Sequence, residues 1–446
     1  MSGEFNSRSL APRILLAIAA LMSFRTFEYF PGMQYIQEAW VGLSLAAIVF
    51  VYPTWKIASG LRFTSFEIYV LFLTLLDLLL PAWAAAREFG QPLLYGLLTQ
   101  RHVLLIATPL LLFLAIRSRL LTPRDIEVVL LWLAWGTWLL YTLMRLLLNP
   151  ENFESTGVGF VSGVNGKPSF VLSSYFITFG LLYYALLGIR RRRSKYYIAA
   201  AVLLVGVIGS ADARSFLVCV AGILLYFVYR WRSVGQFIAG VGKACAVAVV
   251  VLGLVYVVNP VFLSERVGLF SDAFRVVLTG TAGEDYAANA RLFEVATALP
   301  YIQKHPLLGN GEISHQWQGG AQDVLGSYFY AGDVGIIGAL FSVGAIGLLI
   351  FAYQYRFALW AARRLPEAGR NQLSDGVFGF LLYSALISLP QALCVFDPEV
   401  TLFFIAIAVG LACEGIRVRR SVMQSATAIA PSTIRPEQSG SGGHDE

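Results

Sequence analysis

Charged residues are scarce in this chain of 446 residues, where Asp, Glu, Lys and Arg together make up 13%. A water-soluble domain carries about 25% charged residues, so the composition excludes an ordinary soluble globular protein. Hydrophobic residues make up 57% of the chain, and its mean hydropathy is +0.67. Lipid is therefore the expected solvent for most of the sequence.

Cysteines and nucleotide-binding motifs are also scarce. The chain lacks an internal repeat, a heptad run, a Walker loop and a GxGxxG motif. We interpret the cysteines as buried structural thiols, because they lie in apolar stretches without metal-ligand spacing. We predict neither a metal site nor a cofactor. The four cysteines are Cys219, Cys245, Cys394 and Cys413.

Apolar runs of about 20 residues, in contrast, recur along the chain, and this length crosses a hydrocarbon core about 30 Å thick. Backbone polar groups in lipid must be satisfied within each segment, so the runs predict helices. The alternation typical of barrel strands is absent. The sequence predicts an all-α polytopic membrane protein. The twelve expected transmembrane helices lie at residues 11–29, 37–53, 66–86, 102–117, 125–148, 168–189, 196–210, 215–230, 236–258, 333–353, 374–393 and 399–416.

Lys and Arg are concentrated in alternate loops, which predicts that both termini lie in the cytoplasm. The net charge of +6 follows from this topology and does not indicate nucleic-acid binding. We expect residues 1–420 to form the membrane domain. Residues 421–446, rich in Ser, Gly, Pro and Thr, are expected to form a disordered cytoplasmic tail.

Three segments are long or unusual on the predicted outer side: residues 149–168, 209–215 and 259–332. The third is about 75 residues long, and connections beyond about 12–15 residues are generally functional or disordered. Its aromatic and aliphatic residues argue against disorder. We therefore expect the active site in the loop 259–332, on the outer side of the membrane.

This loop has internal order. Leu292, Val295 and Leu299 recur at helical spacing and predict a helix over 288–304, with a kink or break at Pro300. HPLLGNG follows at 305–311, and the next apolar run, 333–353, contains four glycines that permit close helix contact.

The order of Arg291, HPLLGNG and GDVGIIGALFSVGAIGLLIF (332–351) resembles the signature of the O-antigen ligase and polymerase superfamily. SADARS at 210–215 is similar to an "SR" element of that family. The resemblance covers the whole predicted topology, and its motifs cover about 50 positions.

The resemblance implies a metal-independent glycosyltransferase of the GT-C type in the bacterial inner membrane, acting on its periplasmic side. Its donor would be a glycan linked to undecaprenyl diphosphate. Its partners would be membrane lipid and, in the same pathway, a flippase and a chain-length regulator. The family's two arginine positions match Arg214 and Arg291, whose guanidinium groups suit a diphosphate. Arg101, at the outer end of the fourth run, is a candidate third cation.

The sequence departs from the family pattern at one point. Where the family has His-Asn before the GiiG stretch, this chain has GGAQDVLGSYFY, with Asp323 and no histidine. Asp323 or His315 would then supply the base. The absent histidine favours a polymerase of repeat units over a ligase that transfers glycan to lipid A–core.

Each candidate also has a structural interpretation. Arg214 would anchor a helix end at the headgroups, and Arg291 would pair with Glu294 along one helix face. Asp323 and Asp333 would cap helices, and His315 would be structural or simply exposed. Asp77, in the middle of the third run, is expected to have an internal cationic partner.

Two other classes of function stay open. A transporter or lipid-glycan flippase would have two related halves and short outer loops, and we find no similarity between the halves. A non-enzymatic envelope-assembly protein would tolerate loss of the outer arginines.

Overall fold

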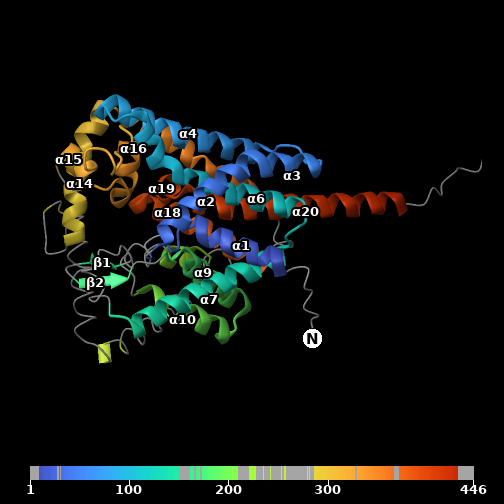
Figure 1. The fold of residues 1–446 in the computed structure, drawn as a ribbon. Helices are drawn as coiled ribbons and strands as arrows, with labels where there is room; N and C mark the ends of the chain where they lie inside the picture. Colours follow the sequence, from blue (N-terminus) through green and yellow to red (C-terminus); the bar gives the residue numbers. More distant parts are fainter. Residues whose placement is uncertain are drawn as a thin grey trace, which may run out of the picture.

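The computed structural model describes residues 10–27, 30, 32–149, 161–164, 167–170, 173–208, 220–227, 286–326, 329–365 and 371–429, with a few isolated positions between 235 and 281. Apart from one β-hairpin, the described elements are helical (Figure 1). In chain order they are α1 (Leu10–Ser23), α2 (Met33–Ala46), the π-helix η2 (Ala47–Val51), α3 (Tyr52–Ala58), α4 (Ser65–Phe89), α5 (Leu93–Thr99), the 3-10 helix η3 (Gln100–Ile106), α6 (Ala107–Arg117), α7 (Pro123–Leu147), β1 (Val161–Val164), β2 (Lys167–Phe170), α9 (Tyr175–Arg191), α10 (Ser194–Ile208), α14 (Tyr286–Lys304), α15 (Ala321–Leu325), the 3-10 helix η4 (Ala331–Val334), α16 (Gly335–Ala352), α17 (Gln354–Arg364), α18 (Gln372–Gln391), α19 (Leu393–Phe396) and α20 (Pro398–Ile429).

Seven helical segments in the described part are long and apolar enough to cross a membrane, and each matches one of the twelve predicted runs. The helical, membrane-type fold is therefore confirmed, whereas the number twelve is not. Of two further predicted runs, 215–230 is described as helix only over residues 220–227, and 236–258 lies almost wholly outside the described residues. The seven segments are Tyr35–Ala58, Ser65–Phe89, Leu93–Arg117, Pro123–Leu147, Ala331–Arg364, Gln372–Gln391 and Pro398–Ile416.

Two other predicted runs, 11–29 and 168–189, are shorter in the structure, whereas α10 has the length predicted for 196–210. α1 ends at Ser23, and α9 begins only at Tyr175 because residues 167–170 form β2. β2 pairs antiparallel with β1, with Val161 opposite Phe170.

α20 is longer than predicted. It continues to Ile429, nine residues into the segment expected to be a disordered tail, and residues 430–446 lie outside the described part. Composition misled here because residues 421–429 include helix-forming Met, Gln and Ala before the first proline at 431.

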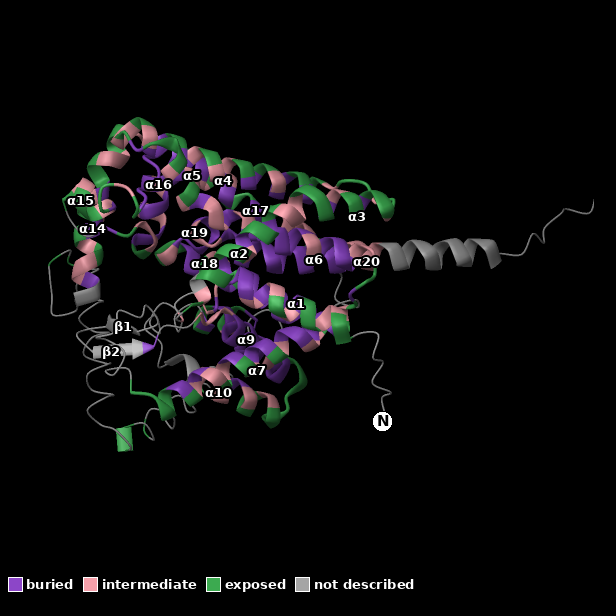
Figure 2. Cartoon of the chain, in the orientation of Figure 1, coloured by how far each residue is buried: buried purple, intermediate pink, exposed green. Residues whose placement is uncertain are grey.

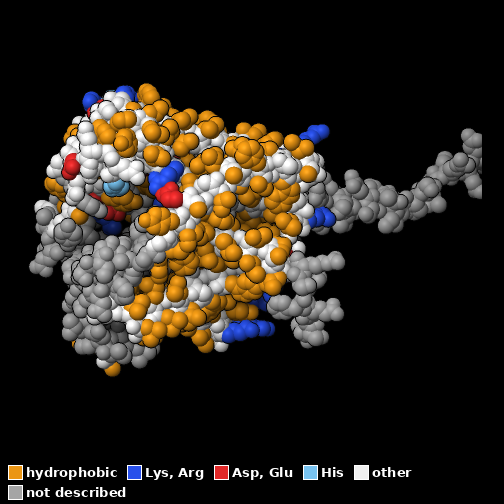
Figure 3. All heavy atoms as spheres, in the orientation of Figure 1, with side chains coloured by type: hydrophobic (Ala, Val, Ile, Leu, Met, Phe, Trp, Pro, Cys, Tyr) orange, Lys and Arg blue, Asp and Glu red, His pale blue; other side chains and the backbone are white. Residues whose placement is uncertain are grey.

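The outer surface of the bundle is apolar where it faces the membrane. Leu15, Ile57 and Leu349 expose 67–81% of their surface. Figure 3 shows a broad hydrophobic belt with Lys and Arg near its two ends. Inward-facing residues are buried (Figure 2), and burial reaches 78% of the Pro398–Ile416 segment but only 22% of Tyr35–Ala58. α20 is thus a central helix, and the α2–α3 segment is peripheral.

The two ends of the bundle differ in what they carry. The start of α1 and the end of α20 lie at one end, at the right of Figure 1, together with α3. α14 and α15, which belong to the loop 259–332, lie at the opposite end. The described ends of the chain, Leu10 and Ile429, therefore lie at the same end of the bundle.

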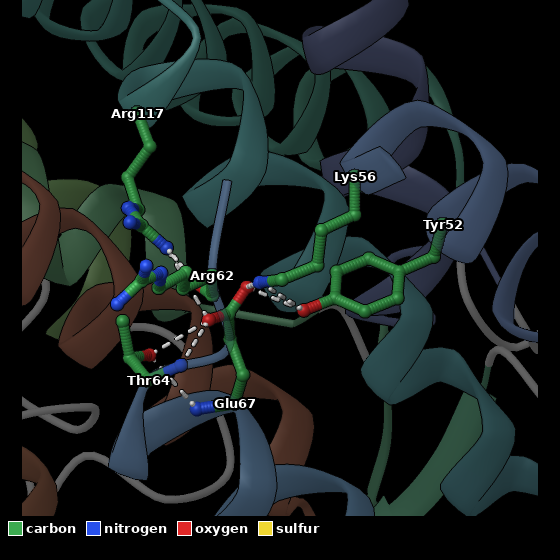
Figure 4. A network of polar contacts seen from close by, with 6 residues as sticks. All are labelled: Tyr52, Lys56, Arg62, Thr64, Glu67 and Arg117. Carbon is green, nitrogen blue, oxygen red and sulfur yellow. Dashed lines mark hydrogen bonds and ion pairs between the residues drawn. The ribbon is translucent and has the colours of Figure 1, made fainter. Parts of the chain in front are cut away.

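A buried ion pair joins three helices at the end that carries the termini (Figure 4). The Lys56 ammonium on α3 contacts Glu67 on α4, and their side chains are 2% and 0% exposed. Tyr52 donates a hydrogen bond of 2.5 Å to the same carboxylate, and Arg117 of α6 lies 3.4 Å from it. Glu67 also accepts from the backbone N–H of Thr64 at 2.7 Å in a capping box. One carboxylate therefore fixes the ends of α3, α4 and α6.

A helix break lies at the opposite end. Gly344 has φ +66° and ψ −177° and interrupts α16, and the segment 306–311 enters the gap. The carbonyls of Phe341 and Ser342 accept from the N–H groups of Asn310 and Gly311 at 2.7 and 2.9 Å.

The other half of the gap is filled in the same way. The N–H groups of Ala345 and Ile346 donate to the carbonyls of Pro306 and Leu307 at 2.9 and 3.1 Å. HPLLGNG thus supplies partners for the carbonyls of Phe341 and Ser342 and for the N–H groups of Ala345 and Ile346, which the break leaves without helical partners.

Glycines make this approach possible. A Cβ on Gly309 would lie 2.6 Å from the backbone of Gly344, and one on Gly344 would lie 2.4 Å from Leu307. A Cβ on Gly311 would lie 2.1 Å from the carbonyl oxygen of Pro81 in α4. The predicted close packing of the glycines in the 333–353 run is confirmed at Gly338, whose Cβ would lie 1.8 Å from the backbone of Ala331.

We predict that Gly311→Ala destabilises the protein by about 2–6 kcal/mol, because it adds a backbone clash to a residue with φ +83°. Thermal unfolding in detergent measures the effect. Gly136→Ala is the matched control, since nothing lies within 4 Å of its added methyl group inside α7. Equal melting temperatures of the two variants would contradict the packing described.

A second prediction concerns the buried ion pair. Lys56→Met leaves the Glu67 carboxylate without its nearest cation and should cost about 3–5 kcal/mol. The double variant Lys56→Met/Glu67→Gln removes the charge but keeps the capping and tyrosine contacts. It should unfold at a higher temperature than Lys56→Met alone. A double variant that is no more stable than the single one would disprove this assignment.

Candidate functional site

A cavity of about 430 Å³ opens at the end of the bundle that carries α14 and α15. Figure 3 shows a hollow on that side with acidic and histidine side chains in it. The cavity is walled by α4, η3, α14, η4 and the segments that precede α9 and α20. Its charged and histidine lining residues are Arg25, Asp77, His102, Arg291, Glu312, His315, Asp333, Asp397 and Glu399.

The segment that follows α14 is fixed by the end of α4. Glu88 binds Lys304 at 2.7 Å and the Nε2 atom of His305 at 2.8 Å. Arg87 donates to the carbonyl of Gly309 at 2.9 Å and stacks on Trp83. His305 is therefore a structural residue, and the motif is clamped between α4 and the break in α16.

Residues 312–314, which follow the motif, are also held by hydrogen bonds. The side chain of Gln91 accepts from the N–H of Ser314 at 2.7 Å and donates to the carbonyl of Glu312 at 3.3 Å. Gln100, from η3, donates to Glu312 Oε2 at 2.8 Å. The Glu312 carboxyl group therefore faces the cavity from a backbone that is held on both sides.

Arg25 supplies a cation to the cavity wall from the turn after α1. Its backbone has φ +50°, in the left-handed region that non-glycine residues rarely adopt. The guanidinium forms an ion pair with Asp397, and Glu399 lies 3.8 Å away. Tyr175 donates to the second oxygen of Asp397 at 2.8 Å. This network joins the start of α9 and α20 to the end of α1.

Arg291 and His315 both line the cavity, as the sequence predicts for a shared site. Arg291 lies on the exposed side of α14, which runs unbroken through Pro300. The helix continues through Pro300 because the carbonyl of Ala296, which loses its N–H partner, lies on an exposed face where water can bind it. Arg214, the other predicted phosphate ligand, lies outside the described residues.

Two predicted site residues lie elsewhere. Asp323 is exposed in the first turn of α15 and does not line the cavity, so it lacks the shielded environment expected of a base. Arg101 does not line it either. Its guanidinium makes two hydrogen bonds to Glu38, one of 2.7 Å. The carboxylate of Glu38 holds Arg101 on the outer surface of the bundle instead.

The capping and pairing expectations are also corrected. α16 is preceded by Val334 without a side-chain cap, and Asp333 lies in η4 on the cavity wall. Asp77 has no ion-pair partner among the described residues. Its carboxyl group lies close enough to Glu312 for mutual repulsion.

Glu294, on α14, is buried behind this wall. The sequence predicted only that it would pair with Arg291. Its Oε1 atom accepts from the N–H of Tyr330 at 3.2 Å, and Oε2 is buried without a hydrogen bond in the described structure. Burial, and then the Asp333 charge, raises the pKa of Glu294 from 4.5 to about 7. Tyr330 and Arg291 act in the opposite direction.

Arg25 and Glu312 are the principal additions that the structure makes to the site. Glu312 directly follows HPLLGNG in the sequence, and this position next to a glycine-rich motif could have identified it as a site residue. Arg25 is separated from Asp397 by 372 positions, and no local pattern indicates that contact. No group of three or more His, Cys, Asp or Glu suited to a metal ion occurs among the described residues.

No protein-family model matches this chain, and no curated protein matches it. The arrangement of the cavity residues therefore carries the functional argument.

The pKa of Glu294 predicts a pH effect on stability. Because the folded-state pKa is raised, stability is full below pH 4.5 and falls as pH rises through about 7. Glu294→Gln, which cannot ionise, should gain on the order of 2–3 kcal/mol over wild type between pH 5 and pH 8. Melting temperatures at the two pH values measure this gain. Glu414→Gln, on α20, should show no such gain, and an equal gain in both variants would refute the assignment.

Proposed function

We propose that the protein is a membrane glycosyltransferase that polymerises oligosaccharide repeat units carried on undecaprenyl diphosphate, at the periplasmic face of the inner membrane. The observation that carries the proposal is that Arg291 and His315, from the loop with the motif, line one cavity with Arg25 and Glu312. The cavity lies at the end of an apolar bundle, where a lipid-linked sugar has its polar group.

The two parts of the donor, its prenyl chain and its diphosphate, require different environments. Its prenyl chain is soluble only in the membrane, beside the apolar helix faces. Its diphosphate is a leaving group whose negative charge needs fixed cations, and arginine gives two parallel hydrogen bonds to phosphate oxygens without titrating. Arg291 is exposed on α14 at the cavity and fits this role. Arg25 is held on the opposite segment by Asp397 and Glu399.

The acceptor is a sugar hydroxyl, which is recognised by hydrogen-bond acceptors. Five carboxyl groups line the cavity, on Asp77, Glu312, Asp333, Asp397 and Glu399. A polar, carboxylate-rich wall suits a neutral glycan that presents many hydroxyl groups. It disfavours a phosphate directly beside the carboxylates, so the donor diphosphate is expected near the arginines and the acceptor hydroxyl near the carboxylates.

A ligase that transfers the finished glycan to lipid A–core is the alternative. The family's histidine, on which that reading depends, has no counterpart here, and Asp323 near its place is exposed outside the cavity. We therefore favour the polymerase. Its partners would be the flippase that delivers the repeat units and a regulator of chain length.

Arg291 is the residue whose substitution tests the proposal. We predict that Arg291→Ala and Arg291→Lys both abolish long glycan chains, with single repeat units still exported, because lysine cannot form the two parallel phosphate contacts. Gel analysis of glycans from a deletion strain carrying each variant measures this. Arg124→Ala, at the exposed start of α7, is the matched control and should keep long chains.

Other outcomes decide between the functions. Long chains in both Arg291 variants, at normal protein levels, would disprove the catalytic assignment. Free lipid-linked polymer with a bare lipid core in the deletion strain would indicate a ligase. Repeat units that stay on the cytoplasmic side would indicate a transporter.

A further inference from the structure

Glu312 is placed differently from every other carboxylate of the cavity. It directly follows HPLLGNG, whose backbone is hydrogen-bonded into the break of α16. Gly311, next to it, is in contact with α4 so close that a methyl group would clash. Gln91 holds both the carbonyl of Glu312 and the N–H of Ser314. The position of this carboxyl group therefore has little freedom.

The surroundings of Glu312 keep its carboxyl group reactive. One oxygen accepts from Gln100 at 2.8 Å, and the side chain lines the cavity. Burial raises the pKa of Glu312 above its ordinary 4.5, and Gln100, Arg25 and His315 partly offset this effect. A raised pKa makes the ionised carboxylate a stronger base toward the acceptor hydroxyl.

We propose that Glu312 is the general base of the transfer, which rests on the function proposed above. The acceptor hydroxyl oxygen forms a bond to C1 of the donor sugar, and the bond between C1 and the phosphate oxygen breaks. The diphosphate leaves with the electron pair and stays on the lipid. The hydroxyl proton passes to the Glu312 carboxylate, so atoms and charges balance without a further reactant.

The geometry favours Glu312 over the bases expected from sequence. Asp323 is exposed and lies outside the cavity. His315 lines the cavity but is exposed on a turn, close to Gly320. Glu312, in contrast, is fixed through its backbone and through one oxygen, which leaves the other oxygen for the acceptor. General bases must be positioned within hydrogen-bond reach of the proton, and Glu312 is the more firmly positioned group.

The test separates chemistry from donor binding. The substrate is the lipid-linked repeat unit extracted from the deletion strain, and the binding probe is undecaprenyl diphosphate, both with the full chain in lipid nanodiscs. Glu312→Gln should lower turnover roughly 10²–10⁴-fold and change probe affinity less than about twofold. Glu312→Asp, which keeps a base, should retain intermediate turnover. Wild-type turnover should fall as pH drops through the raised pKa of Glu312, whereas the residual turnover of Glu312→Gln should not.

The controls make each failure distinct. Glu414→Gln makes the same chemical change far along α20 and should match wild type. Glu312→Gln with wild-type turnover, or with probe affinity lost in parallel, would overturn the role of Glu312 but leave the polymerase intact. No polymer from wild-type protein, together with undiminished probe binding by Arg291→Ala, would overturn the proposed function itself.

Discussion

The fold around the site depends on one backbone contact, the insertion of residues 306–311 into the break of α16. At Gly344 the helix is interrupted, and the inserted segment supplies partners for two carbonyl and two N–H groups beside the break. Unsatisfied backbone groups are costly in a membrane environment, so neither the break nor the segment is stable without the other. The contact fixes a loop segment to the transmembrane bundle. It thereby restricts the positions of the residues that follow the segment.

This constraint explains why the cavity lies where it does. The inserted segment is also clamped by Arg87, Glu88 and Gln91 at the end of α4, so Glu312 faces the interior between α4 and η3. Arg25, from the other side, is held by Asp397 between α19 and α20. The cavity is therefore assembled from segments at both ends of the chain and from the central loop. Opposite charges on these segments keep it polar although the surrounding surface is apolar.

Local patterns predicted much of this structure from the sequence. Long apolar runs identified seven membrane-type helices, and the glycines of the 333–353 run correctly indicated close backbone contact. Arg291 and His315 were placed in one site. What failed depends on distant contacts. Arg101 pairs with Glu38, and Arg25 meets Asp397 across 372 positions. No spacing in the sequence records such pairs, because tertiary packing decides which charges meet.

The central claim is that the cavity holds a lipid diphosphate next to Arg291, with Glu312 on the acceptor side. A cryo-electron microscopy structure of the protein in nanodiscs with undecaprenyl diphosphate tests it most directly. The account predicts density for the two phosphate groups inside the cavity, within hydrogen-bond distance of the Arg291 guanidinium, and open space between the phosphate and Glu312. Phosphate density bound elsewhere on the bundle, with the cavity free of it, would contradict the account.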